Sequence, residues 1–132
     1  MGRVQLGRLP SFISRRREIA SRFTDAFKSL PLGIPQVDGH VFFRYVVSTP
    51  ERGTLEQHLN SNGIEAKRPV YKAAHLYFGG GRDEGNVVLE ADYPNSDRAH
   101  LEALSMPIHP SLSDDEVDVV VQSVTEFFES RD

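Results

Sequence analysis

The stretch that most restricts the fold is HVFFRYVVS at residues 40–48, the clearest strand in this 132-residue chain. It is rich in aromatic and β-branched residues, which favour extended backbone. Alternate side chains of a strand point to opposite faces, and here both faces are largely apolar: Val41, Phe43, Tyr45 and Val47 on one, and Phe42, Arg44 and Val46 on the other. The strand is therefore expected to be central in its sheet and covered on both sides.

A long amphipathic helix is predicted before this strand. Residues 14–30 carry apolar side chains at helical spacing, namely Ile19, Phe23, Phe27 and Leu30. Residues 4–13 also have helical spacing, and Pro10 is expected to kink the helix or restart it there. We therefore predict a linking helix over residues 1–30, kinked near Pro10, followed by a domain over residues 31–132.

The middle of the chain predicts shorter elements. Residues 50–63 are expected to form a helix that ends at Asn62-Gly63, a C-terminal cap signal. Residues 64–71 are expected to be extended, and Pro69 makes them a poor central strand. Further on, the sequence predicts a loop over 78–86, a short strand over 87–91 and a helix over 93–104.

The last helix has the clearest start signal. Ser113 and Glu116 have the spacing of a capping box, and the residues that follow make one apolar stripe of Val117, Val120, Val124 and Phe127. Several helices on a small sheet, without regular alternation of strand and helix, predict an α+β fold with a small, mostly antiparallel sheet.

Composition excludes several kinds of site. The chain has no cysteine, so disulfides, zinc–thiolate sites and cysteine nucleophiles are excluded. None of the five histidines pairs with another at zinc-ligand spacing, so no metal site is expected. No apolar run approaches the roughly 20 residues that cross a bilayer, and no signal-peptide pattern opens the chain. We expect a cytoplasmic protein that does not bind a membrane.

The charge is unevenly distributed. Residues 1–30 hold seven basic and two acidic side chains, a net +5, which leaves −9 for the rest of a chain whose total is −4. A basic helix of this kind is typical of a nucleic-acid arm or of a helix that docks on an acidic surface. The overall pI near 5.7 argues against nucleic acid.

The three lysines are Lys28, Lys67 and Lys72. Lys72 lies in RPVYKAAH, residues 68–75, and this segment is either a reaction centre or one wall of a site. A lysine that forms a Schiff base needs a lowered pKa, hence an apolar pocket or a neighbouring cation. Composition and spacing alone do not decide between these alternatives.

Three stretches together resemble one family, the DegT/DnrJ/StrS-type aminotransferases, which use pyridoxal phosphate (PLP) to aminate nucleotide-linked keto sugars. Residues 4–23 resemble the linking helix of that family, residues 55–75 its helix, Gly-Ile turn and substrate loop, and residues 104–121 its closing segment. The resemblance is to the C-terminal small domain of such fold-type-I enzymes. It implies that the large domain, with the Schiff-base lysine, is not represented here.

The resemblance also implies a site. Tyr71, Lys72 and His75 would face the sugar-nucleotide side, with Lys72 as a phosphate contact, and His40 would lie near the same cleft. No catalytic or PLP-binding residue is implied in this chain. Where many relatives have proline and a larger apolar residue after the lysine, Ala73-Ala74 stand here.

The expected function is therefore that of a small domain which is inert alone, either as a fragment or as one half of a split enzyme. The alternative is a non-catalytic module that binds a nucleotide sugar or a protein. The apolar stripe of the 14–30 helix and one face of the 40–48 strand exceed what a domain this small is expected to cover. We therefore expect self-association, as a dimer or larger assembly, or pairing with a separate PLP-binding chain.

Overall fold

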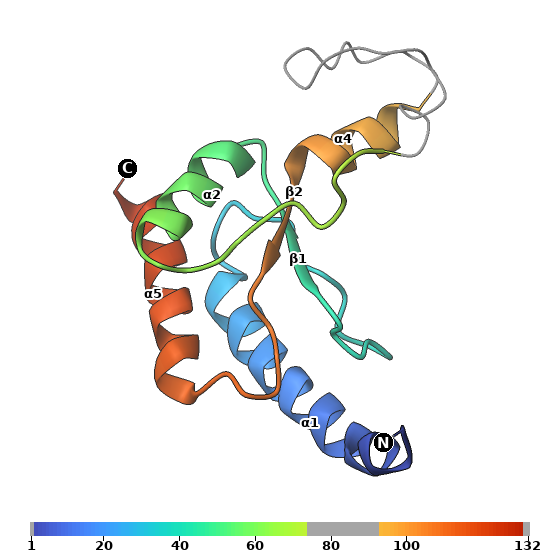
Figure 1. Ribbon diagram of the computed structural model, residues 1–132. Coiled ribbons are helices and arrows are strands. Elements are labelled where there is room, and N and C mark those ends of the chain that lie inside the picture. Colours follow the sequence, from blue (N-terminus) through green and yellow to red (C-terminus); the bar gives the residue numbers. More distant parts are fainter. Residues whose placement is uncertain (1, 74–92, 131–132) are drawn as a thin grey trace.

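The computed structural model describes residues 2–73 and 93–130. The described elements are, in chain order, α1 (Gly2–Phe27), β1 (Tyr45–Ser48), α2 (Arg52–Ser61), α4 (Pro94–Glu102), β2 (Ala103–Met106) and α5 (Asp114–Glu129). Strands β1 and β2 pair antiparallel, which confirms the predicted α+β class. Figure 1 shows α2 and α5 on one side of the strands and α4 on the other. The predicted loop at 78–86 and strand at 87–91 lie outside the described residues.

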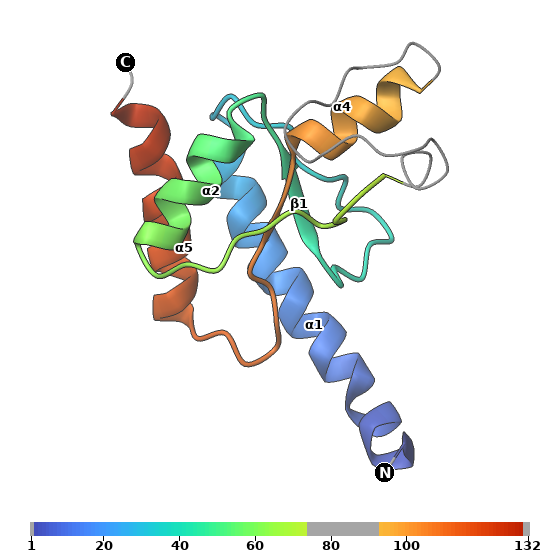
Figure 2. The same cartoon turned by 45° about the horizontal axis from the view of Figure 1, so that its top comes forward.

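Helix α1 is longer than the 14–30 pattern and stays helical through Pro10, so it does not restart there. Its C-terminal half buries an apolar stripe that includes Phe23 and Phe27, both 0% exposed. Leu6 and Leu9 continue the apolar pattern but are 68% and 45% exposed. This N-terminal half projects beyond the rest of the molecule (Figure 2). No helix in the described part of the chain is long and apolar enough to span a bilayer.

The core centres on Tyr45 of β1, which is fully buried. Its ring centroid lies 5.3 Å from that of Phe23, and its hydroxyl lies 3.0 Å from Oγ1 of Thr24, a hydrogen bond that satisfies the buried group. Burial raises the pKa of the Tyr45 hydroxyl. The predicted stripe of α1 is thus covered by this chain's own strand. The expectation that this stripe exceeds what the domain covers is wrong for Phe23 and Phe27.

The predicted strand over 40–48 is too long. Only Tyr45–Ser48 is a strand, because Gly39 and Phe42 have positive φ values of 71° and 49° that turn the backbone before it. The turn breaks the predicted alternation: Phe42, and not Phe43, is buried with Tyr45 and Val47, and Phe43 is 68% exposed. Within β1 the residues alternate between fully buried and half-buried. One face of the strand therefore lies in the core and the other is partly covered.

Helix α2 ends where the sequence predicts. Gly63, with φ of 76°, donates to the carbonyl of Asn60, and Ile64 donates to the carbonyl of Leu59 at 2.9 Å. This is the Schellman arrangement, which needs a left-handed residue that glycine supplies without strain. Leu59 and Ile64 are both buried, so the cap also directs the following segment back to the core.

Strand β2 occupies the end of the predicted 93–104 helix, which is wrong for residues 103 and 104. Leu104 is fully buried opposite Val47, so pairing with β1 prevails over helical spacing here. The other edge of β2 carries a single bridge between Ser105 and Lys67. The segment after α2 is thus extended but forms no strand in the described chain, as Pro69 predicts.

Helix α5 begins with the predicted capping box. The backbone N–H of Glu116 donates to Oγ of Ser113, and the backbone N–H of Ser113 donates to the Glu116 carboxylate at 2.8 Å. The hydrogen bonds from Ser113, backbone first, lower the pKa of Glu116. The apolar stripe of this helix is buried as predicted, through Val117, Val120, Val124 and Phe127.

Candidate functional site

Residues 68–73, which include Tyr71 and Lys72, follow the bridge that joins Lys67 to Ser105, and Figure 1 shows this segment running toward α4. Tyr71 is 71% exposed, and Lys72 is half-buried. Both side chains are therefore at or near the surface, where a ligand can reach them. His75, the third predicted residue of this segment, lies outside the described residues.

His40 belongs to the turn before β1. Its Nδ1 accepts a hydrogen bond from the backbone N–H of Phe42 at 2.8 Å, and its carbonyl accepts one from Nε of Arg17 at 3.0 Å. In the neutral ring the proton then lies on Nε2, and His40 is an exposed residue. His40 therefore stabilises the turn, and the described contacts do not join it to Tyr71 or Lys72.

The structure adds a basic-aromatic cluster that sequence reasoning missed. It consists of Arg16 and Arg17 from α1 and Phe43 and Arg44 from the turn before β1. The guanidinium carbons of Arg16 and Arg44 lie 5.7 and 5.8 Å from the centroid of the Phe43 ring. These are cation–π distances. The sequence contained the signal, since three arginines follow one another at 15–17 and Arg44 follows two phenylalanines, but residues 40–44 were expected to be a strand.

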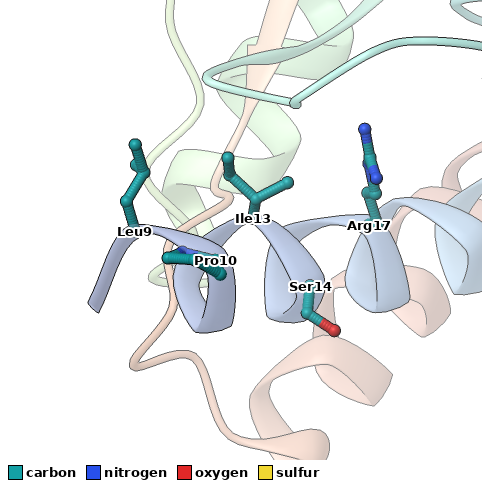
Figure 3. A pocket seen from close by; sticks show the side chains of 5 residues that line it. All are labelled: Leu9, Pro10, Ile13, Ser14 and Arg17. Atoms are coloured by element: carbon teal, nitrogen blue, oxygen red, sulfur yellow. The ribbon is translucent and has the colours of Figure 1, made fainter. Parts of the chain in front are cut away.

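A shallow groove of about 390 Å³ lies beside this cluster on α1. It is lined by Leu9, Pro10, Ile13, Ser14 and Arg17. Figure 3 shows Leu9, Ile13 and Arg17 pointing to the same side of the helix and Ser14 to the other. The groove is thus apolar with one guanidinium at its end.

Two other arginines of α1, Arg15 and Arg22, form a clamp to α5. Arg15 donates to Asp114 at 2.8 Å, and Arg22 bonds Asp114 at 3.0 Å and also Asp118. The basic helix therefore docks on an acidic surface of its own chain, which is the second of the two alternatives that its charge left open. The hydrogen bond from Arg15 lowers the pKa of Asp114, and the bond to Asp114 is the main cause of the raised pKa of Arg15.

This clamp predicts a specific acid sensitivity. Because the folded-state pKa of Asp114 is lowered, the stabilisation it supplies is present above its unfolded pKa of about 3.9 and is lost as pH falls through the lowered value. We expect the melting temperature to fall on acidification below about pH 5, and to fall less for Asp114→Asn. The matched control is Asp115→Asn, at a neighbouring exposed carboxylate of the same helix turn. A wild-type pH profile in Asp114→Asn would contradict the clamp.

Two of the three lysines occupy positions that do not suit imine formation. Lys28 lies 3.6 Å from Asp25, and Lys67 lies 2.6 Å from Glu65, and both lysines are exposed. An imine-forming amine needs desolvation or a neighbouring cation. A surface ammonium beside a carboxylate has the opposite environment. Within the described residues, no group of three or more metal-ligating side chains is present.

Comparison with known proteins finds one family and several of its members. The model of the DegT/DnrJ/EryC1/StrS aminotransferase family matches residues 1–125. The spore coat polysaccharide biosynthesis protein SpsC of Bacillus subtilis is 33% identical, over all of this chain and 36% of its own length. The dTDP-4-dehydro-2,3,6-trideoxy-D-glucose 4-aminotransferase of Saccharopolyspora spinosa is also 33% identical, over 91% of this chain and 31% of its own length.

A solved structure agrees with these sequence matches. The aminotransferase TlmJ from Streptoalloteichus hindustanus superimposes with a TM-score of 0.81 at 29% identity, covering 99% of this chain and 35% of that one. The chain thus spans about a third of the length of the proteins it matches.

Proposed function

Because the chain belongs to the DegT/DnrJ/EryC1/StrS aminotransferase family, we propose that it is the small-domain part of a PLP-dependent aminotransferase for nucleotide-linked keto sugars. One observation carries this proposal: nearly the whole chain matches the family, yet it spans only 31–36% of the two relatives compared above. The Saccharopolyspora relative, named for an aminotransferase of a dTDP-linked keto sugar, supports the substrate class.

The cofactor is proposed to bind mainly to polypeptide outside the described residues. PLP supplies the electron sink for amino transfer, and the protein supplies a lysine amine, orientation and electrostatics. Lys28 and Lys67 do not fit the lysine role, because each is exposed beside a carboxylate. We therefore derive no catalytic step for these residues and propose that the chain is inert alone.

The residues proposed to face the sugar nucleotide are His40, Tyr71, Lys72 and His75. The exposure of Tyr71 and of His40 supports access from solvent. Lys72 is proposed as a phosphate contact, since its ammonium is a mobile point charge on a flexible stem.

The partner is proposed to cover the open half of the α1 stripe. Leu6 and Leu9 are too exposed to contribute to this chain's core, and the groove at Leu9 and Ile13 continues the same face. An exposed apolar surface of this kind is typical of an interface between domains or chains. The occupant proposed is a PLP-binding large domain, in the same or a separate polypeptide, and self-association is the alternative.

Reductive trapping tests the proposal directly. The chain is mixed with PLP, treated with borohydride and mapped by mass spectrometry. We expect no single stoichiometric lysine adduct, because Lys28 and Lys67 are exposed beside carboxylates and Lys72 is proposed to face the substrate phosphate. One stoichiometric adduct at Lys28, Lys67 or Lys72, abolished by the matching Lys→Arg change, would contradict the proposal.

The open surface also favours the alternative of a non-catalytic interaction module. The two readings differ in what a PLP-binding domain does for the chain. Amino transfer on adding such a domain supports the enzyme reading. Binding of nucleotide sugar without amino transfer in any combination supports the module.

A further inference from the structure

Four arginines in the C-terminal half of α1 fall into two groups. Arg15 and Arg22 face α5 and pair with its carboxylates. Arg16 and Arg17 face the turn before β1, where Arg44 lies as well. In the described part of the chain, none of these three has a carboxylate within ion-pair distance. Three guanidinium groups in one region without counter-charge attract an anion.

The aromatic ring at the centre of this group is held outward. Phe43 is 68% exposed, since the left-handed backbone at Phe42 turns that neighbour inward instead. Arg16 and Arg44 share the ring of Phe43 at 5.7 and 5.8 Å. The Nε atom of Arg16 is buried and has no acceptor among the described residues. Packing on the Phe43 ring therefore fixes the Arg16 guanidinium in place, while its Nε–H donor is left without an acceptor in the described part of the protein.

Arg17 links the cluster to the groove. Its Nε donates to the carbonyl of His40 at 3.0 Å, which fixes the guanidinium against the turn. Its side chain also lines the groove beside Leu9 and Ile13. The terminal amino groups of Arg17 make no hydrogen bond to the described part of the protein. A ligand beside the turn thus meets a guanidinium whose outer donors are available.

We propose that Arg16, Arg17 and Arg44, together with Phe43, bind the diphosphate of an organic diphosphate. Guanidinium groups bind phosphate oxygens in pairs of parallel hydrogen bonds, which lysine does not reproduce. The exposed ring of Phe43 supplies a surface for the organic part. That the carrier is a nucleotide-linked sugar rests on the proposed function; a free nucleoside diphosphate has the same chemistry. The site is separate from the segment that holds Tyr71 and Lys72.

Calorimetric titration of the full chain tests this site with three probes: inorganic diphosphate, dTDP and dTDP-glucose. We expect Arg16→Gln and Arg44→Gln each to raise the Kd for dTDP about tenfold, the loss of one charge-assisted hydrogen bond. Phe43→Ala should weaken the binding of dTDP more than the binding of inorganic diphosphate. The matched control is Arg98→Gln, which removes the same charge from an exposed position on α4. It should leave each Kd unchanged.

Several results would overturn the proposal. One is an absence of heat with every probe at millimolar concentration. Another is a rise in the Kd for dTDP in Arg98→Gln as large as that in Arg16→Gln or Arg44→Gln. A third is a raised Kd in Lys72→Gln with an unchanged Kd in Arg44→Gln. If the chain binds single-stranded DNA and does not bind dTDP, the ligand of the cluster is a nucleic acid and the proposal of an organic diphosphate is wrong. Tighter binding of dTDP-glucose than of dTDP identifies the sugar-linked source, and the reverse identifies the free nucleotide. No probe needs PLP or a second polypeptide. The proposed diphosphate site can therefore be wrong while the proposed function is right, and the proposed function can be wrong while the site is right.

Discussion

Phe23→Ala is expected to lower the free energy of unfolding by about 3–5 kcal/mol, the cost of removing a large aromatic side chain from a packed core. The ring of Phe23 is fully buried, stacks on Phe27 at 5.6 Å and meets Tyr45 edge-on at 5.3 Å. Because β1 contributes Tyr45 to this contact, the change weakens the helix and the strand together. Chemical denaturation followed by far-ultraviolet circular dichroism measures the loss.

The same substitution at Phe43 provides the matched control. Phe43 is 68% exposed, and its ring contacts two arginines at the surface. Phe43→Ala is expected to cost no more than about 1 kcal/mol, the scale of an exposed cation–π contact. Equal losses at Phe23 and Phe43 would mean that the core is not centred on the α1–β1 contact.

A chimera is expected to show the largest functional effect. In it, this chain replaces the matching segment of the Saccharopolyspora relative, which it resembles at 33% identity. With PLP and an amino donor, we expect the chimera to convert that enzyme's dTDP-linked substrate about 10⁶-fold faster than the uncatalysed reaction, the low end of enzymic rate accelerations. The chain alone with PLP is expected to stay at the background rate. Time-resolved product analysis by mass spectrometry measures both.

The open half of α1 supplies the control for this chimera. Leu9→Asp with Ile13→Asp places charge in the groove and leaves Phe23 and Phe27 in their core. If another domain covers this surface, the change should reduce turnover about 30-fold or more, the scale set by loss of about 2 kcal/mol at an interface hot spot. Full turnover in this variant would contradict the proposed docking surface, and background turnover in the unaltered chimera would contradict the proposed function.

Local signals in the sequence were sufficient for the end of α2 and the start of α5. The capping box at Ser113 and the cap at Asn62-Gly63 act within a few residues, so their outcome depends little on the rest of the chain. The stripe of α5 also depends only on helical spacing. These elements were therefore predicted with their correct ends.

The strands depended on contacts between distant residues. Residues 40–44 have the composition of a strand. Phe42 instead adopts a left-handed backbone conformation that buries its side chain, and its residue type does not predict that conformation. Residues 103 and 104 were predicted as the end of a helix, but they belong to β2, where Leu104 pairs with Val47 of β1. Tertiary pairing overrides local preference in both places.

The substrate-facing roles of His40, Tyr71, Lys72 and His75 stay predictions. His40 and Tyr71 are exposed as a substrate-facing role requires, but His40 also holds the turn through Phe42 and Arg17. The cluster of Arg16 and Arg44 around Phe43 was missed, although its residue types were visible, because these residues meet only after the 39–44 turn folds back on α1. Residues far apart in sequence meet through the fold, and spacing does not show this.

The position of the trapped cofactor in the chimera tests the central claim most directly. Borohydride treatment in the presence of PLP, followed by peptide mapping, identifies the lysine that carries the cofactor. The adduct is predicted to fall on a lysine of the Saccharopolyspora segment, with Lys28, Lys67 and Lys72 unmodified. A single stoichiometric adduct on one of those three lysines would contradict the conclusion that this chain completes a site whose cofactor is held by other polypeptide.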